Sequence, residues 1–198
     1  PAPYDLHGLT PDDLIDLTPE LNAEAREILD RHRWGPIFLP PWLAVDAPDG
    51  KIGAIQSPGP VGGSDWNGAA LDPETGILYV PSITAPMVAA LTAPTDSRSN
   101  VDYRIGGGGF LQGKQGLPIT KPPWGRITAI DLNTGEHLWM TANGDGPRDH
   151  EALVGLDLPP LGHRGRAQSL VTKTLLFVTD GSKDMIAVPA GGGGRFIR

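Results

Sequence analysis

The sequence contains no cysteine among its 198 residues. Disulfides, thiolate metal sites and haem attachment through a CxxCH motif are therefore excluded within this chain. Basic residues are also in short supply, because 16 Lys and Arg stand against 23 Asp and Glu, for a net charge of −7. Since no Lys/Arg cluster offsets this balance, the sequence argues against a nucleic-acid partner.

Long apolar runs are missing as well. No segment approaches the roughly 18 apolar residues that a membrane-spanning helix requires. The chain begins with Pro1 and shows no signal-peptide pattern. We interpret it as a processed or incomplete piece of a larger protein.

Glycine and proline are abundant, at 27 and 21 residues, and they follow no collagen-like period. This composition predicts short strands joined by long loops. A chain of this length, with 39% hydrophobic residues, is long enough to bury a sizeable core.

Residues 1–35 are predicted to be helical. Thr10 and Asp13 fit a capping box, and Thr18-Pro19 fits an N-cap followed by proline at the first helical position. Four apolar residues share one face of a helix that we expect to run to about Arg33: Leu21, Ala25, Ile28 and Leu29. We expect a surface helix packed on a larger body.

After Pro36 the apolar period changes to two, which is typical of strands. Short strands are predicted in PIFLPPW (36–42) and KIGAIQSP (51–58). Three strand pairs follow, each with its own turn, in residues 69–82, 126–146 and 165–181. Residues 83–125 show little periodicity, and we interpret them as a long ordered insertion or lid.

These strands form a repeat. Residues 64–82 supply the first two strands of a unit, and residues 126–142 supply the last two after the insertion. Residues 166–180 begin the next unit, and RFIR (195–198) stands where RITAID stood before. Four-stranded units of about 40–45 residues are typical of β-propeller blades.

The predicted fold is therefore all-β, a partial β-propeller with an N-terminal helix. We expect a helical lead-in at 1–35 and an incomplete propeller at 36–198, with one full blade and parts of its neighbours. Because open blade edges invite pairing, the remaining blades or a companion chain are the expected partner.

A family resemblance rests on Ala129-x-Asp131-x-x-Thr134-Gly135-x-x-x-Trp139. This pattern resembles the tryptophan-docking repeat of quinoprotein alcohol and sugar dehydrogenases, in which the Trp packs flat between blades. Two longer phrases look like the glucose, polyol and quinate dehydrogenase branch: GLPITKPPWGRITAIDLNTGEHLW and NGDGPRDHEALVGLDLPPLGHRGR. The resemblance covers roughly residues 3–198.

The resemblance implies a function. In that family pyrroloquinoline quinone (PQQ) lies in the central funnel, a Ca²⁺ polarises it, and an aspartate base takes the proton of the alcohol. We expect the base and the calcium ligands outside this chain, so the isolated chain is expected to be inactive. The implied substrates are sugars, polyols or other alcohols, the implied electron acceptor is a quinone or cytochrome, and the implied location is the periplasm.

The first candidate site residues lie in Gly62-Gly63-Ser64-Asp65-Trp66. In the family, a Gly-Gly-x-Asn-Trp phrase places the Asn on the quinone edge and the Trp against the cofactor. An Asp here opposes an anionic cofactor unless a cation compensates. Asp65 therefore either binds substrate hydroxyls, pairs with an arginine, approaches the metal or caps a turn. Asn67 is a further candidate.

Arg166 and Gln168 stand just before the third strand pair. The matching segment of the family approaches the cofactor, and a guanidinium suits a PQQ carboxylate. The alternative for Arg166 is an ordinary salt bridge.

Trp139 is expected to be buried between blades. Lys121 and Trp124 either cover the funnel mouth from an open position or belong to a Pro-rich loop pinned by one aromatic. No metal ligand is assigned, because His150 in DHE matches no common zinc spacing.

A rival interpretation is a non-catalytic PQQ-like propeller that serves as a scaffold for protein assembly. A scaffold needs the docking Trp and Gly residues, but it does not need polar groups at Asp65, Trp66 or Arg166. A relative that has lost the cofactor is also consistent with Asp65.

Overall fold

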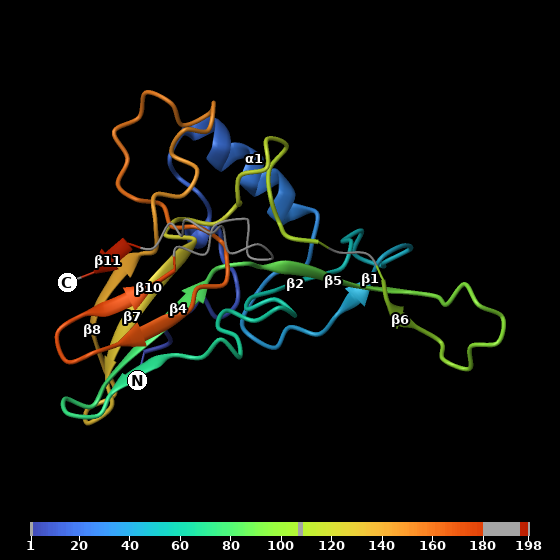
Figure 1. Cartoon of the computed structure of the whole chain (residues 1–198). Coiled ribbons are helices and arrows are strands. Elements are labelled where there is room, and N and C mark those ends of the chain that lie inside the picture. Colours follow the sequence, from blue (N-terminus) through green and yellow to red (C-terminus); the bar gives the residue numbers. More distant parts are fainter. Residues whose placement is uncertain (1, 107–108, 180–194, 198) are drawn as a thin grey trace. The chain divides into compact units, whose positions relative to one another are not determined.

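The structure is a computed structural model that describes residues 2–106, 109–179 and 195–197 (Figure 1). These residues form strands, one α-helix and one 3₁₀ turn, so the predicted mostly-β fold is confirmed. The chain divides into two compact units. Unit 1 comprises residues 1–5, 62–84 and 122–198, and unit 2 comprises residues 6–61 and 85–121. The predicted domain boundary at residue 35 stays a prediction.

Unit 2 contains the helical elements. Thr10 and Asp13 form the predicted capping box around the 3₁₀ turn η1 (Pro11–Asp13). Helix α1 (Pro19–Asp30) begins after Thr18, whose hydroxyl accepts a hydrogen bond from the Leu21 amide at 3.3 Å. The helix buries Leu21, Ala25 and Leu29 and half-buries Ile28, and it ends three residues before the predicted Arg33. No helix among the described residues is long and apolar enough to cross a membrane.

A small mixed sheet completes unit 2. Strand β5 (Met87–Thr92) pairs in parallel with β1 (Trp42–Leu43) and antiparallel with β2 (Ala54–Gln56) and β6 (Arg104–Ile105). The insertion therefore supplies two strands of its own. The strand predicted at 36–42 is wrong except at its last residue, because the backbone turns at residues 37–38 and Phe38 has a positive φ of 69°.

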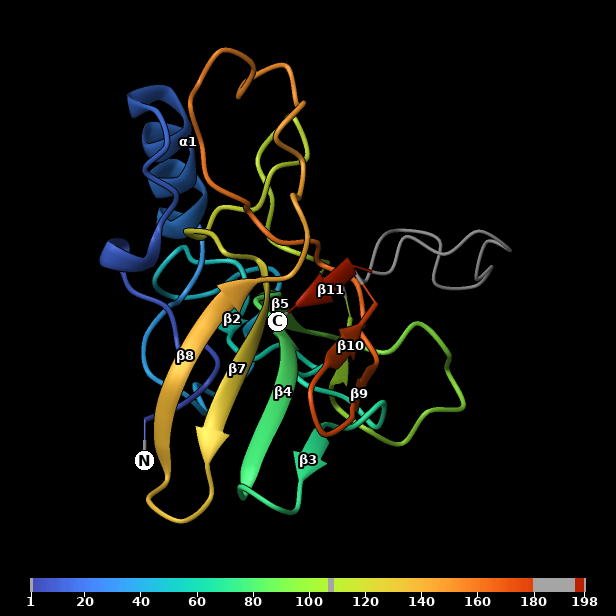
Figure 2. The same cartoon turned by 60° about the vertical axis from the view of Figure 1, so that its left-hand side comes forward.

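Unit 1 contains a complete blade. Strands β3 (Ala70–Asp72), β4 (Ile77–Ile83), β7 (Gly125–Asp131) and β8 (Glu136–Ala142) form one antiparallel sheet in that order. Figure 2 shows the four strands side by side. The predicted blade, with its insertion between the second and third strands, is confirmed.

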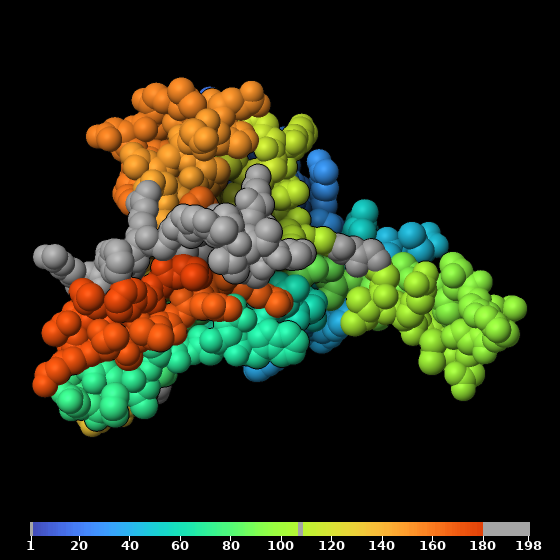
Figure 3. All heavy atoms as spheres, viewed as in Figure 1, coloured from blue at the N-terminus to red at the C-terminus, as the bar shows by residue number. Residues whose placement is uncertain are grey.

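A second blade begins with β9 (Ser169–Val171), β10 (Leu176–Val178) and β11 (Arg195–Ile197) in the order β11-β10-β9. The segment RFI thus pairs with β10 as β7 pairs with β4, which confirms the predicted repeat. A shared apolar core joins the two blades: Ala70, Ile127, Ala167, Leu176 and Val178. Figure 3 shows residues 166–179 (red) directly against the green segment that contains β3.

Aromatic packing in the blade follows the register of its strands. Tyr79, Ala129 and Trp139 lie opposite one another on β4, β7 and β8. Because the buried Ala129 carries only a methyl group, the two rings meet across it with centroids 5.8 Å apart. Trp139 remains 38% exposed, so its predicted burial between blades is not found among the described residues.

Candidate functional site

The candidate site is built on residues 62–67, called the site loop below, which lead into β3. Gly62 has a φ of +74°, a conformation that glycine adopts without strain. The loop is fixed to the end of β4, because the Ile83 amide donates to the Gly63 carbonyl at 2.8 Å and the Ser64 hydroxyl donates to the Pro81 carbonyl at 3.0 Å. The blade therefore determines where the loop lies.

Asp65 closes a turn and forms an ion pair. Its carbonyl accepts a hydrogen bond from the Gly68 amide at 2.9 Å, and its Oδ1 accepts one from the Trp66 amide at 2.7 Å. Its Oδ2 lies 2.6 Å from Nε of Arg166. Of the alternatives for Asp65, the structure thus shows both the turn and the arginine partner.

Arg166 reaches the loop from the segment before β9. The ion pair joins the entries to β3 and β9, the first strands of two successive blades. The side chains of Arg166 and Asp65 are 37% and 21% exposed, so the pair is partly open to solvent. Only Nε of Arg166 has a partner among the described residues, which leaves both Nη groups able to donate to an anion.

Among the described residues, the side chains of the remaining candidates form no hydrogen bond with the Asp65–Arg166 pair. Trp66 is 89% exposed and adjoins the ion pair through the chain. Asn67 is half-buried and makes no side-chain hydrogen bond to a described residue, while the side chain of Gln168 is exposed. The backbone of Gln168 pairs with Thr179 across the start of the second blade. Site roles for Asn67 and Gln168 stay predictions.

The interpretation of Trp124 as an open aromatic is wrong. Trp124 is only 1% exposed, its amide donates to the Leu161 carbonyl at 2.7 Å, and its carbonyl accepts from Thr84 at 2.8 Å. It is therefore a core residue that fixes a Pro-rich loop. Lys121, in unit 2, lies 3.1 Å from Asp16 in an exposed ion pair.

Metal ligation finds no support in residues 2–106 and 109–179, where no group of three or more Asp, Glu or His side chains could hold an ion. His150 has a local role, because its Nδ1 accepts a hydrogen bond from the Ala152 amide at 3.2 Å. The described residues therefore supply no set of ligands for a calcium ion.

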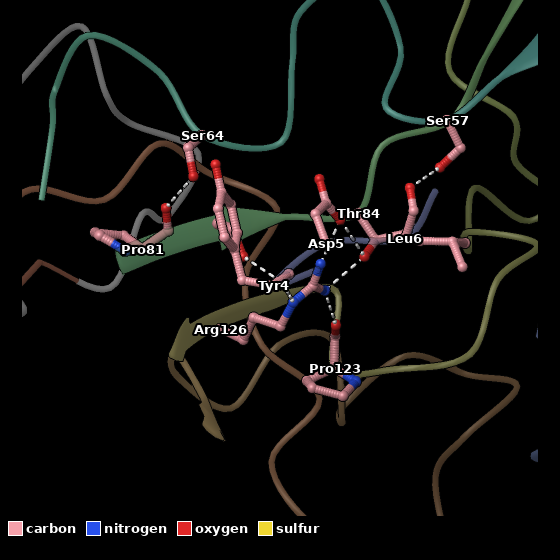
Figure 4. A network of polar contacts seen from close by, with 10 residues as sticks. Tyr4, Asp5, Leu6, Ser57, Ser64, Pro81, Thr84, Pro123 and Arg126 are labelled. Atoms are coloured by element: carbon pink, nitrogen blue, oxygen red, sulfur yellow. Dashed lines mark hydrogen bonds and ion pairs between the residues drawn. The ribbon is translucent and has the colours of Figure 1, made fainter. Parts of the chain in front are cut away.

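A buried polar network was missed from the sequence. Arg126, on β7, forms an ion pair with Asp5, and the two side chains are among the most buried charged groups described (Figure 4). Burial lowers the pKa of the Arg126 guanidinium below its ordinary value, and the Asp5 carboxylate opposes that effect. The one signal in the sequence was that Arg126 directly precedes the mostly apolar run ITAI of the same strand. A charge buried in such a strand requires a partner.

Comparison with known proteins agrees with this fold. Residues 1–190 match the PQQ family described as the β-propeller domain of glucose, ethanol and alcohol dehydrogenases. The glycerol dehydrogenase large subunit of Gluconobacter oxydans is 32% identical over 143 residues, covering 56% of this chain and 18% of that protein.

Two glucose dehydrogenases are also similar. Quinoprotein glucose dehydrogenase A of Acinetobacter calcoaceticus is 23% identical, covering 76% of this chain and 22% of its own. Quinoprotein glucose dehydrogenase of Escherichia coli is 27% identical, and the match covers 63% of this chain and 17% of that protein. The chain thus spans about a fifth of the length of these relatives. With the family matched over most of its length, the chain belongs to the PQQ-dependent dehydrogenases, within their β-propeller domain.

Proposed function

We propose that the chain is a segment of a PQQ-dependent dehydrogenase that oxidises a sugar, a polyol or another alcohol, and that the site loop and Arg166 bind the cofactor. The family match and the names of the relatives support this proposal. The observation that carries it is the Asp65–Arg166 pair beside the exposed Trp66.

The pair holds the guanidinium of Arg166 beside Asp65. Because the ion pair involves Nε alone, the two Nη groups remain able to form a bidentate contact with a carboxylate of PQQ. The positive charge of Arg166 also compensates Asp65, which removes the objection to a carboxylate near an anionic cofactor. Trp66 offers a flat apolar face against which a planar quinone can stack.

The redox chemistry belongs to the cofactor, since PQQ, when bound, supplies the acceptor for the hydride of the alcohol. The residues of this chain bind and orient it. We place the proton-accepting base and the calcium ligands in other blades. The remaining blades or a companion chain, a quinone or cytochrome acceptor and a periplasmic location complete the proposal, all by family resemblance.

The test is a PQQ titration of the protein with all its blades, followed by dye reduction with glucose and simple alcohols. Arg166→Gln is expected to weaken PQQ binding about tenfold or more, because a hydrogen-bonded charge contributes about 1.5–3 kcal/mol. Arg98→Gln, which removes an exposed ion pair in unit 2, is the matched control. A complete propeller that binds no PQQ would contradict the proposal.

The scaffold alternative is less consistent with the site. A scaffold needs the docking Trp and Gly residues, but it does not require an arginine that offsets the charge of Asp65 beside an anionic cofactor. It predicts that the complete propeller binds no PQQ, with or without Arg166→Gln.

A further inference from the structure

We propose that Asp5, held by Arg126, is a positioning residue for the site loop, so that the buried pair sets the geometry at which Asp65 meets Arg166. The proposal deepens the proposed function, because the loop's role in cofactor binding rests on it. All residues involved belong to unit 1.

Arg126 is immobilised by its hydrogen bonds. Its Nε donates to the Tyr4 carbonyl at 3.1 Å, and its Nη1 donates to the Thr84 hydroxyl at 2.5 Å and to the Pro123 carbonyl at 3.0 Å. Its Nη2 donates to Oδ1 of Asp5. Four of the five guanidinium N–H groups are thus committed in different directions, as Figure 4 shows, so the head group has one orientation.

Asp5 carries this orientation to the site loop. A Cβ atom on Gly63 would lie only 1.5 Å from Oδ2 of Asp5, so the backbone of Gly63 packs directly on the carboxylate. Any side chain at residue 63 would force the carboxylate or the loop to move. The second glycine of the GGSDW phrase is therefore required by the close approach of Asp5.

The Arg126 guanidinium also contacts the chain at the end of β4, to which the site loop is hydrogen-bonded. Ile83 donates to the Gly63 carbonyl, and the next residue, Thr84, accepts from Arg126. Asp65 follows Gly63 by two residues and ends at the Arg166 ion pair. A continuous series of contacts therefore connects the buried pair to the half-exposed one.

A buried ion pair is weak evidence for stability, because desolvation of both charges offsets their attraction. Its best attested value lies in specifying one arrangement. Because Asp5 contacts the backbone of Gly63, we assign to the buried pair the role of fixing the position of the site loop.

Amide hydrogen exchange on the full chain tests the inference without cofactor. Asp5→Asn is expected to speed exchange of the Trp66 and Gly68 amides about tenfold or more, while the amides of β8 exchange as in the unaltered chain. Asp96→Asn, at an exposed pair in unit 2, is the control and leaves the loop unchanged. Uniform acceleration throughout unit 1, or none in the loop, overturns the proposal.

Three further variants test the contact itself: Asp5→Ala, Gly63→Ala and the double variant. Gly63→Ala keeps the buried ion pair, so unchanged exchange in its loop overturns the proposal even where removal of the Asp5 carboxylate unfolds the chain. Gly63→Ala is expected to open the loop while Arg126 keeps its partner. In Asp5→Ala/Gly63→Ala the clash is gone, so the double variant should exchange no faster in the loop than the faster single variant. Additive effects would show that the two residues act independently and would overturn the proposal.

A PQQ titration of the complete protein separates the two proposals. Asp5→Asn is expected to weaken PQQ binding about tenfold, and unchanged binding despite a loosened loop overturns the link to the site. If the unaltered protein binds no PQQ, the proposed function fails, while the exchange experiments still decide the positioning role.

Discussion

At the scale of single residues, the contribution of Asp65 depends on its ion pair with Arg166. A double-mutant cycle with Asp65→Asn and Arg166→Gln is expected to give a coupling of about 0.5–1 kcal/mol in urea unfolding, because the pair is partly exposed. The Asp96–Arg98 pair is more exposed and is expected to show a coupling near zero. A coupling at Asp65–Arg166 no larger than this control would mean that the pair does not hold in solution.

Asp72 provides a pH-dependent contribution. The hydrogen bond from the Thr75 hydroxyl, with that from the Glu74 amide, holds the pKa of Asp72 below its usual range. Because the folded-state pKa is lowered, its stabilisation is fully present above the unfolded pKa of about 3.9 and is lost as the pH falls through the folded value.

We therefore expect Thr75→Val to raise the pKa of Asp72, measured by carboxyl NMR, and to flatten the acid-induced fall in Tm below about pH 4. Thr134→Val, in the equivalent turn of the same blade, should leave the pKa of Asp72 where it is. An unchanged pKa in Thr75→Val would refute the assigned cause.

At the level of residues, the structure confirms one alternative that the sequence suggested, an arginine partner for Asp65, while the cofactor-binding roles stay predictions. Asp65 and Arg166 were named as candidates, and an arginine partner for Asp65 was one of the alternatives. Asp5 was missed because its partner lies 121 residues away and no local pattern joins them. Trp124 was misplaced because its Pro-rich surroundings do not reveal the Leu161 and Thr84 backbones that enclose it.

At the scale of elements, the two turns of the blade repeat one design. Gly76 and Gly135 have φ values of +74° and +77°, and each amide donates to the Asp carbonyl four residues earlier. The turns also contact each other, because the Leu132 amide donates to the Gly76 carbonyl at 3.0 Å. The motif Asp-x-x-x-Gly therefore fixes both hairpins and their mutual packing.

Gly76→Ala is expected to destabilise unit 1 by more than the roughly 1–2 kcal/mol of left-handed backbone strain. The added Cβ would also lie 2.9 Å from Nδ2 of Asn133 in the neighbouring turn. Gly155→Ala is the matched control, since Gly155 has a φ of +87° but open space around its Cβ position. Equal losses in thermal unfolding of the two variants would rule out contact between the turns.

Elements were predictable wherever periodicity and turn chemistry agreed. The caps of α1 and the strand pairs around Asp72–Gly76 and Asp131–Gly135 are local signals. The strands β5 and β6 were not foreseen, because their own sequences show no alternation. In addition, β5 pairs with β1 and β2 from a distant part of the chain, and β6 pairs only with β5. The strand predicted in PIFLPPW was wrong because an apolar run that contains prolines is as compatible with a turn as with a strand.

At the scale of the whole molecule, the chain divides into two compact units, and α1 belongs to unit 2. Leu29→Ala, at a buried position of α1, is expected to cost about 2–5 kcal/mol. Hydrogen exchange should show the loss in unit 2 and leave the amides of β7 and β8 in unit 1 unaffected. Glu27→Ala, on the exposed side of the helix, is the control, and equal acceleration in both units would show that they unfold as one.

The insertion between β4 and β7 leaves and re-enters the blade at a single point. Ile83 lies opposite Gly125 in the ladder, and the Thr84 amide donates to the Trp124 carbonyl. The blade therefore fixes the two ends of this excursion at neighbouring positions, whatever the length of chain between them. The register of β4 against β7 is thus independent of how many residues lie between Thr84 and Trp124, so changes of length within the excursion leave the blade's ladder in place.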